Sequence, residues 1–496
     1  MLAATSAGLF RTEDGGFTWK RIWDDNTFDV EFQHNNGKIV YATTNRVLKS
    51  VDAGKSFVAI TDTCKCARYS VQIAASNPNV VYTLHSHNAE DADSDEVVEK
   101  STNAGITWKT VVPPMVAMYG YYDNVLAVSP VNESVVIVAG VNLRRSNDGG
   151  NTWDTIVTAG HVDNHCIEFS PQSDLIMMCG NDGGVFGTEN GGATWASLNR
   201  GLSITQFYQS ASCKTNPNLM ICGAQDNGNL QYETGLFSES PGIGDGMGGF
   251  FDWSNPRTIY AAFQDGDFMR SDDGGLHFRS IRTDTDGAWN APWCQDPRAA
   301  TTIYAGTDRI YQSTNQGATW TPISPVFGSG NRITLLKVAE KDPAIIYAGN
   351  GVALYRTVTG GRQWEDITAG LPVDRCFLTS ISINDATPEV AIVTFSGYEL
   401  GQKVYRTNDG GNTWRNISGT LPNIPVNCCV CQNAIHNPVY VGTDAGVYYI
   451  DDTLSDWIPF KFGMPNVIVD HLEIQYANKS IIAATYGRGM WHASLR

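Results

Sequence analysis

The 496-residue sequence has few charged residues and no long apolar segment. Asp, Glu, Lys and Arg together make up 17% of the chain, below the roughly 25% of an average globular protein. No run of about 18 apolar residues is present, so we expect no transmembrane helix and no membrane insertion. The chain also begins without the pattern of a signal peptide.

Basic residues are scarce relative to acidic ones. The sequence contains 34 Lys and Arg against 51 Asp and Glu, which gives a formal net charge of −17. Nucleic acids and anionic membrane surfaces are bound through basic faces. We therefore expect no nucleic-acid partner, and a glycan or another protein as the partner instead.

The 11 cysteines do not contain two C-x-x-C pairs, the arrangement that is typical of zinc sites. Cys64 and Cys66 form a C-x-C pair, and Cys428, Cys429 and Cys431 form C-C-x-C. We interpret them as small buried residues in strands, and we expect any disulfide to join separate hairpins. The sequence predicts no cofactor from these residues.

A repeated octapeptide, Ser/Thr-x-Asp-x-Gly-x-Thr-Trp, dominates the chain. Its two cleanest copies span residues 146–153 and 407–414. Close variants end at Trp19, Phe57, Trp108, Trp195, Phe278, Trp320 and Trp364. The spacing of these copies divides the sequence into about 12 units of roughly 41 residues.

Each unit contains short apolar runs separated by Gly, Asp and Asn turns, which indicates an all-β fold. A period of about 40 residues with three to four strands is typical of propeller blades. We predict a β-propeller of about 12 four-stranded blade units arranged as two tandem propellers. The alternative is one large ring of ten to twelve blades. The expected organisation is a first set of blades at 1–200, degenerate blades and a candidate boundary at 201–267, and a second set at 268–496.

The octapeptide has a structural explanation. Asp and Ser/Thr side chains can hydrogen-bond backbone N–H groups in a tight turn, and Trp can fill the space between neighbouring blades. We therefore expect structural roles for the aspartates and tryptophans of the repeat, namely Asp14, Asp52, Asp148, Asp273, Asp409, Trp19, Trp108, Trp153, Trp195, Trp320, Trp364 and Trp414.

The octapeptide resembles Asp-box (BNR) repeats, which occur in bacterial sialidases, two-propeller xyloglucanases, sortilin-type receptor domains and photosystem assembly factors. The segments 180–185, 198–202, 205–208, 225–228 and 244–246 resemble a group of secreted bacterial propellers often labelled glycosyl hydrolases. Residues 484–491 resemble the chain ends of that group and of xyloglucanases. The resemblance implies an extracellular location, or one on a cell or virion surface.

Loops between the second and third strands of each blade lie opposite the octapeptide turns, and propellers usually bind ligands there. The octapeptide is not recognisable in residues 201–267. A segment that departs from the repeated sequence pattern often contains a functional site. The candidate catalytic carboxylates come from consecutive units and are expected to be neighbours: Asp182, Asp226, Asp245, Asp265 and Asp267. The candidate ligand-binding residues are Gln225, Asn227, Tyr398, Tyr486 and Arg488.

An acidic insertion follows His87. Its residues Asp91, Asp93 and Asp95 are candidates for binding Ca²⁺ through oxygen ligands, although their spacing is not that of an EF-hand loop. A solvated acidic loop is the simpler interpretation. The histidine pairs 85/87 and 161/165 are likewise interpreted as polar loop residues.

Two functions remain open from the sequence. The favoured interpretation is a non-enzymatic scaffold or recognition protein, a surface or virion component within a larger assembly, that binds glycan or protein. The alternative is a glycoside hydrolase that resembles xyloglucanases and uses paired aspartates. Glycoside hydrolysis needs two carboxyl groups at a defined separation, one with a raised pKa, and the sequence does not give that separation.

Overall fold

The computed structural model describes residues 1–87, 96–111, 122–157, 159–233, 235–239, 244–328, 330–460 and 463–496. Within these ranges the strands form twelve antiparallel sheets, ten with four strands and two with three. The described helical structure is a single short 3₁₀ turn, η1 (Gln264–Gly266). The predicted all-β propeller fold is confirmed. No helix of the described residues is long and apolar enough to span a membrane.

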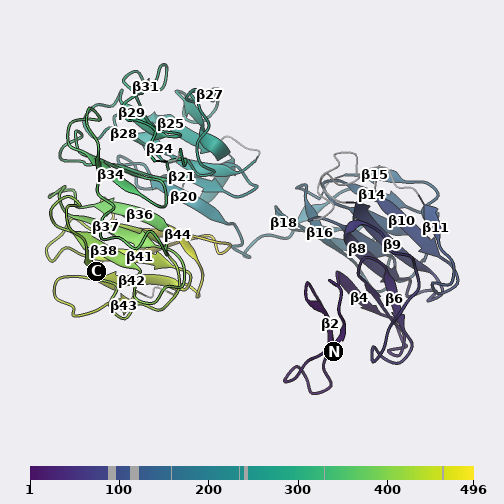
Figure 1. Ribbon diagram of the computed structural model, residues 1–496. Coiled ribbons are helices and arrows are strands. Elements are labelled where there is room, and N and C mark those ends of the chain that lie inside the picture. Colours follow the sequence, from purple (N-terminus) through teal and green to yellow (C-terminus); the bar gives the residue numbers. More distant parts are fainter. Residues whose placement is uncertain are drawn as a thin grey trace. The chain divides into compact units, whose positions relative to one another are not determined.

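The chain divides into two compact units, Met1–Leu202 and Ser203–Arg496 (Figure 1). Consecutive strands form one sheet, or blade, in each case. The five blades of the first unit are β1 (Leu2–Thr5), β2 (Gly8–Arg11) and β3 (Lys20–Trp23); β4 (Asp29–Phe32), β5 (Val40–Thr43), β6 (Val47–Ser50) and β7 (Val58–Ala59); β8 (Cys66–Ile73), β9 (Val81–His87), β10 (Val97–Ser101) and β11 (Lys109–Val111); β12 (Val125–Val128), β13 (Val136–Ala139), β14 (Leu143–Ser146) and β15 (Asp154–Ile156); and β16 (Asn164–Phe169), β17 (Met177–Asn181), β18 (Gly184–Thr188) and β19 (Ala196–Ser197).

The second unit contains seven blades. They are β20 (Phe207–Ser212), β21 (Leu219–Ala224), β22 (Asn229–Glu233) and β23 (Leu236–Glu239); β24 (Gly246–Asp252), β25 (Asn255–Phe263), β26 (Asp267–Ser271) and β27 (Arg279–Ser280); β28 (Trp293–Gln295), β29 (Ile303–Gly306), β30 (Ile310–Ser313) and β31 (Thr321–Pro322); β32 (Leu335–Val338), β33 (Ile346–Gly349), β34 (Leu354–Thr357) and β35 (Glu365–Asp366); β36 (Leu378–Ile383), β37 (Ala391–Phe395), β38 (Val404–Thr407) and β39 (Arg415–Asn416); β40 (Val426–Cys431), β41 (Val439–Thr443), β42 (Gly446–Ile450) and β43 (Ile458–Pro459); and β44 (Val469–Gln475), β45 (Ser480–Thr485) and β46 (Met490–Ser494).

The second strand of each blade carries most of the core. β29 and β33 have the same sequence, Ile-Tyr-Ala-Gly, and all four residues of each strand are buried. The fourth strands β31 and β35 are two residues long and exposed. A blade packs on a neighbour at each face, so its inner strands bury both faces and contain continuous apolar runs instead of alternating residues.

The second unit closes into a seven-bladed ring, because its last blade packs on its first. Phe207 and Cys222 of the first blade share a buried cluster with Ile482 and Ala484 of the last. The backbone N–H of Ser212 donates to both carboxylate oxygens of Glu473, at 2.9 and 3.0 Å. Figure 1 shows β44 beside β20 at this closure.

Candidate functional site

The aspartates of the octapeptide are held within their own turns. Asp148 accepts hydrogen bonds from the hydroxyl of Ser146 at 2.9 Å and from the backbone N–H and hydroxyl of Thr152 at 2.8 and 2.7 Å. These donors favour the ionised carboxylate and lower the pKa of Asp148 to about 2. The same arrangement lowers the pKa at the equivalent aspartates, Asp14, Asp52, Asp273 and Asp409. A carboxyl group with so low a pKa cannot supply a proton near neutral pH.

The tryptophans of the octapeptide make two kinds of contact. Four of them donate the indole N–H to a backbone carbonyl of the preceding blade at 2.6 to 3.0 Å, and these are Trp195, Trp320, Trp364 and Trp414. Trp19 and Trp153 donate within their own turns, to Gly16 and Gly150, and Trp108 packs against a buried cluster. Most of these indoles therefore tie one blade to the next.

Glycines bring the first two blades of the second unit unusually close together. A Cβ added at Gly246 would lie 2.0 Å from the carbonyl oxygen of Gly228, and one added at Gly223 would lie 2.0 Å from the backbone nitrogen of Gly248. Only glycine fits such a backbone approach. This packing explains the glycine-rich segment 244–249 and places Asp245 beside the Gln225–Gly228 turn.

The 225–228 turn presents a polar cluster with an aromatic edge. The side-chain oxygen of Gln225 accepts hydrogen bonds from the Tyr208 hydroxyl at 2.6 Å and the Gln206 amide at 3.0 Å. The Trp289 indole N–H donates to the Tyr208 hydroxyl at 3.4 Å, and half of the Trp289 side chain is exposed. The amide of Asn227 donates to the Gln225 carbonyl at 2.8 Å.

The structure brings two of the predicted catalytic aspartates together. Asp226 has a positive φ of 58°, and its N–H donates to Asp245 Oδ1 at 3.1 Å. Asp245 is buried. Asp265 lies in η1 and Asp267 begins β26, in the turn between β25 and β26 of the next blade.

The predicted ligand-binding residues fall into two groups within the second unit. Tyr486 is half exposed and lies near enough to Tyr208 to contribute, after burial and alongside Asp245 and Asp226, to raising the pKa of the Tyr208 hydroxyl. Arg488 is two residues further along the same exposed loop. Tyr398 is 70% exposed and lies in the loop between β37 and β38, two blades away along the ring.

Asp182 lies in the first unit, in the turn between β17 and β18. Asp226, Asp245, Asp265 and Asp267 belong to the second unit, so the expectation that Asp182 lies beside them stays a prediction. Asp182 Oδ1 accepts a hydrogen bond from His165 Nε2 at 2.7 Å. The octapeptide period predicts neighbouring loops but does not show where one unit ends.

Two further carboxyl groups, those of Asp123 and Asp163, interact electrostatically with the Asp182–His165 pair. Burial, and then the charge of Asp182, raise the pKa of Asp163. Burial also raises the pKa of Asp123 to about 6, with Asp163 and Asp182 adding to the effect. Conversely, the hydrogen bond to Asp182 raises the pKa of His165. We call Asp123, Asp163, His165 and Asp182 the first-unit carboxylate cluster.

Within the first-unit carboxylate cluster, His165 lines a cavity of about 700 Å³ between the innermost strands β4, β8, β12 and β16. Polar lining residues include Asp29, Arg68, Gln72, Asn124 and His165. Ligand-binding cavities usually measure about 300–1,000 Å³. The cavity is therefore large enough for one or two sugar rings, and His165 connects it to the acidic cluster.

Asp123, Asp163 and His165 were missed from the sequence because only the loops between second and third strands were considered. Asp123 lies two residues before the innermost strand β12, Asp163 directly precedes the innermost strand β16, and His165 is the second residue of β16. The beginning of an innermost strand and the loop between second and third strands lie at the same end of a blade. His165, interpreted as a loop residue, is in β16.

Three other sequence predictions concern the first unit. Asp91, Asp93 and Asp95 lie outside the described residues. The expectation that a disulfide joins separate hairpins is wrong, because Cys64 and Cys66 are bonded to each other with their Cα atoms 5.4 Å apart, a separation that disulfides accept. His85, interpreted as a loop residue, is buried in β9.

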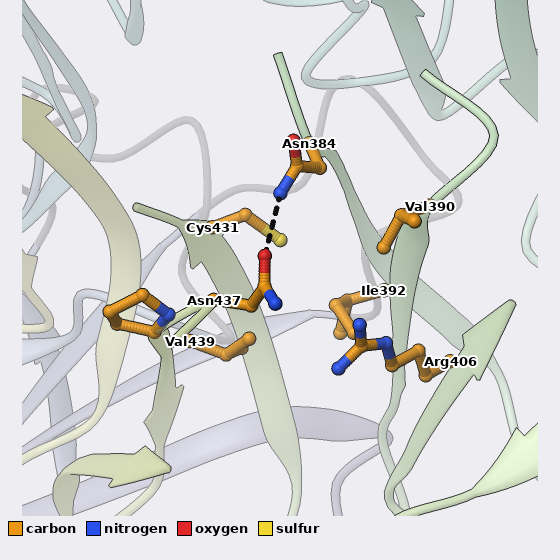
Figure 2. Close-up of a pocket in the computed structure, with 8 residues that line it drawn as sticks. Asn384, Val390, Ile392, Arg406, Cys431, Asn437 and Val439 are labelled. Carbon is orange, nitrogen blue, oxygen red and sulfur yellow. Dashed lines mark hydrogen bonds between the residues drawn. The ribbon is translucent and has the colours of Figure 1, made fainter. Parts of the chain in front are cut away.

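A second, much smaller cavity lies between two neighbouring blades of the second unit (Figure 2). Its volume is about 10 Å³, room for about one water molecule. Asn384 and Asn437 face each other across it, with the amide of Asn384 donating at 3.5 Å, and Cys431 and Arg406 border it. This cavity is too small for a glycan.

The sequence matches no protein-family model and no curated protein. Among solved structures the chain is similar to the GH74 xyloglucanase from Xanthomonas campestris, with 16% identity and a TM-score of 0.69 over 100% of this chain and 81% of that one. It is also similar to a GH74 enzyme from Niastella koreensis, with 17% identity and a TM-score of 0.65 over 99% of this chain and 81% of that one. At these identities the likeness establishes a common propeller fold.

Proposed function

We propose that this chain binds a polysaccharide and hydrolyses its glycosidic bonds. The observation that carries the proposal is the first-unit carboxylate cluster, where burial and a neighbouring charge raise the pKa of Asp163 beside Asp182. A pair of carboxyl groups with different environments is what acid–base cleavage of a glycosidic bond requires. The similarity to GH74 enzymes supports this reading over a scaffold without activity.

In the proposed reaction, Asp163 donates its proton to the glycosidic oxygen as the bond from that oxygen to the anomeric carbon breaks. Asp182 accepts a proton from the water whose oxygen adds to the anomeric carbon. The His165 hydrogen bond orients the Asp182 carboxylate. Asp123 is buried, so its role is to adjust the electrostatic environment without touching substrate.

The second unit supplies a proposed glycan-binding surface. Trp289 and Tyr486 each expose about half of their side chain, and flat aromatic faces suit stacking against sugar rings. Gln225 and Asp226 offer nearby amide and carboxylate groups for sugar hydroxyls. A surface of this composition favours a neutral polysaccharide over an anionic one, because the chain carries a net charge of −17.

The proposal is tested by incubating the protein with β-glucan, xyloglucan, pectin and sialylated oligosaccharides, and reading retention and cleavage by mass spectrometry. We expect cleavage of a neutral glucan, reduced at least 100-fold in Asp163→Asn and in Asp182→Asn. Asp154→Asn, at an exposed carboxylate of the same unit, is the matched control and should retain full activity.

Two results would change the assignment. Loss of cleavage in Asp226→Asn or Asp245→Asn, with Asp163→Asn active, would place catalysis in the second unit. Retention of glycan without any cleavage would favour a recognition protein. That second candidate draws support from Asp245, whose buried carboxylate already accepts the N–H of Asp226 and so helps to hold the turn.

A further inference from the structure

A separate group of side chains in the first unit has the composition of a metal site. Cys64, Cys66 and His85 each offer one ligand atom, and these atoms all lie within 4.8 Å of one another. Cys64 precedes β8 and Cys66 begins it, while His85 comes from β9, the strand paired with β8. The pairing of β8 with β9 therefore brings His85 close to the two cysteines, and the spacing of these residues in the sequence does not predict the contact.

The three donors are shielded by an apolar wall. His85 is 7% exposed, and Cys64 and Cys66 are partly buried against a cluster that contains Tyr41 and Tyr69. The Tyr69 ring meets the His85 ring edge-on, with centroids 4.9 Å apart. Such packing fixes the imidazole orientation and limits water access, and both effects strengthen the binding of a metal by thiolates and imidazole.

The donor set matches one class of cation. Zn²⁺ takes cysteine thiolates at about 2.3 Å and histidine nitrogen at about 2.0–2.1 Å in a tetrahedron, which sets the donor atoms roughly 3.6–3.8 Å apart. The three donor atoms lie within 4.8 Å of one another, and the two sulfurs, which are bonded to each other here, would separate to reach that spacing. Two sulfurs and one imidazole select Zn²⁺ over Ca²⁺ or Mg²⁺, which prefer oxygen ligands.

We propose that Cys64, Cys66 and His85 form a Zn²⁺ site when the Cys64–Cys66 pair is reduced, with solvent in the fourth position. The disulfide and the metal site are two states of the same residues, since a disulfide offers no thiolate. Reduction breaks the S–S bond with two electrons and two protons and gives two thiols. Both thiols release a proton to solvent as the metal binds. The disulfide state thus excludes Zn²⁺.

The test titrates the whole protein with Co²⁺, a spectroscopic substitute for Zn²⁺, after reduction by a phosphine. The phosphine takes up the oxygen of one water as it becomes a phosphine oxide, and the disulfide gains the two hydrogens. We expect a single equivalent of Co²⁺ to give a thiolate-to-cobalt charge-transfer band with the visible bands of a tetrahedral site. Zn²⁺ should then displace the cobalt, and the unreduced protein should show no band.

Substitutions at the three proposed ligands test which of them bind the metal. Cys64→Ser and Cys66→Ser should lose the charge-transfer band, and His85→Gln should weaken Co²⁺ binding at least tenfold. Cys166→Ser, at an exposed free thiol of the same unit, is the matched control and should bind normally. Absence of the band from the fully reduced wild-type protein, verified by alkylation of both thiols, would overturn the proposal. So would an unchanged band in Cys66→Ser.

Discussion

Asp148 and Asp163 have the same side chain, but their surroundings shift the pKa of the carboxyl group in opposite directions. Turn hydrogen bonds from Ser146 and Thr152 favour the charged form of Asp148 and lower its pKa to about 2. Burial and the neighbouring Asp182 charge act in the opposite direction on Asp163. Many aspartates of this chain belong to the first kind, so their number says little about catalysis.

The raised pKa of Asp163 predicts the pH dependence of cleavage. A proton donor works only while protonated, so activity should fall as pH rises through the pKa of Asp163. His161 is a neighbour whose positive charge lowers that pKa. In His161→Asn the alkaline limb of kcat/KM should therefore move to higher pH by a few tenths of a unit. A limb that stays in place or moves to lower pH would contradict the assignment of Asp163 as the acid.

The exposed ring of Trp289 allows a test of the proposed glycan-binding surface. Removing its exposed ring in Trp289→Ala should raise KM for the polysaccharide about tenfold, which corresponds to ~1.4 kcal/mol of binding, and leave kcat nearly unchanged. The control is Leu276→Ala, at a 77%-exposed apolar residue of an octapeptide turn in the same unit. Equal effects of the two substitutions would show that the Trp289 surface does not bind glycan.

Glu473 takes part in the closure of the second unit, because its carboxylate accepts the Ser212 N–H across the first and last blades. Burial raises the pKa of its carboxyl to about 7, from an ordinary value of 4.5. The folded state therefore binds a proton more tightly than the unfolded state, so this stabilisation is complete below pH 4.5 and is lost as pH rises to about 7 and above. The shift corresponds to about 3 kcal/mol.

Glu473→Gln should remove this dependence while its amide oxygen still accepts the Ser212 N–H. Thermal unfolding at pH 5 and pH 8 should show a smaller difference in Tm for the variant than for the wild-type protein. Glu389→Gln, at an exposed carboxylate of the second unit, should behave like the wild type. An unchanged difference in Glu473→Gln would mean that Glu473 does not titrate in this range.

At the scale of elements, the close approach of the first two blades of the second unit depends on glycine. Gly246→Ala would place a Cβ 2.0 Å from the Gly228 carbonyl oxygen, and backbone cannot yield as a side chain does. We expect a loss of at least ~1–3 kcal/mol of stability and weaker glycan binding, because Asp245 and the 225–228 turn would separate. Gly37→Ala, where nothing lies within 4 Å of the added Cβ, should be nearly neutral in chemical denaturation.

At the scale of the whole molecule, each described apolar cluster belongs to one unit alone. The cluster around Val125 and Phe186 lies within Met1–Leu202, and the cluster around Phe207 and Ile482 lies within Ser203–Arg496. Units with separate cores are expected to unfold separately. Differential scanning calorimetry should resolve two unfolding transitions. Glu473→Gln should alter the pH dependence of the transition of the second unit alone. A single transition that shifts as a whole would contradict this expectation.

The sequence alone determined the kind of fold. Octapeptide spacing revealed the blade period because every blade needs the same turn and the same inter-blade contacts, and each copy is local enough to read along the chain. The identical Ile-Tyr-Ala-Gly strands at 303–306 and 346–349 follow from the same repeated packing. The sequence also indicated that the 225–228 and 244–246 segments were unusual.

Only the tertiary structure decided which residues meet. It grouped Asp182 with Asp163 and His165, and brought His85 to the Cys64–Cys66 pair. These contacts join neighbouring strands and blades whose register is set by packing, and a pKa depends on burial that no local pattern contains. A repeat therefore predicts its scaffold well, whereas its functional sites lie where different copies, each with its own substitutions, come together.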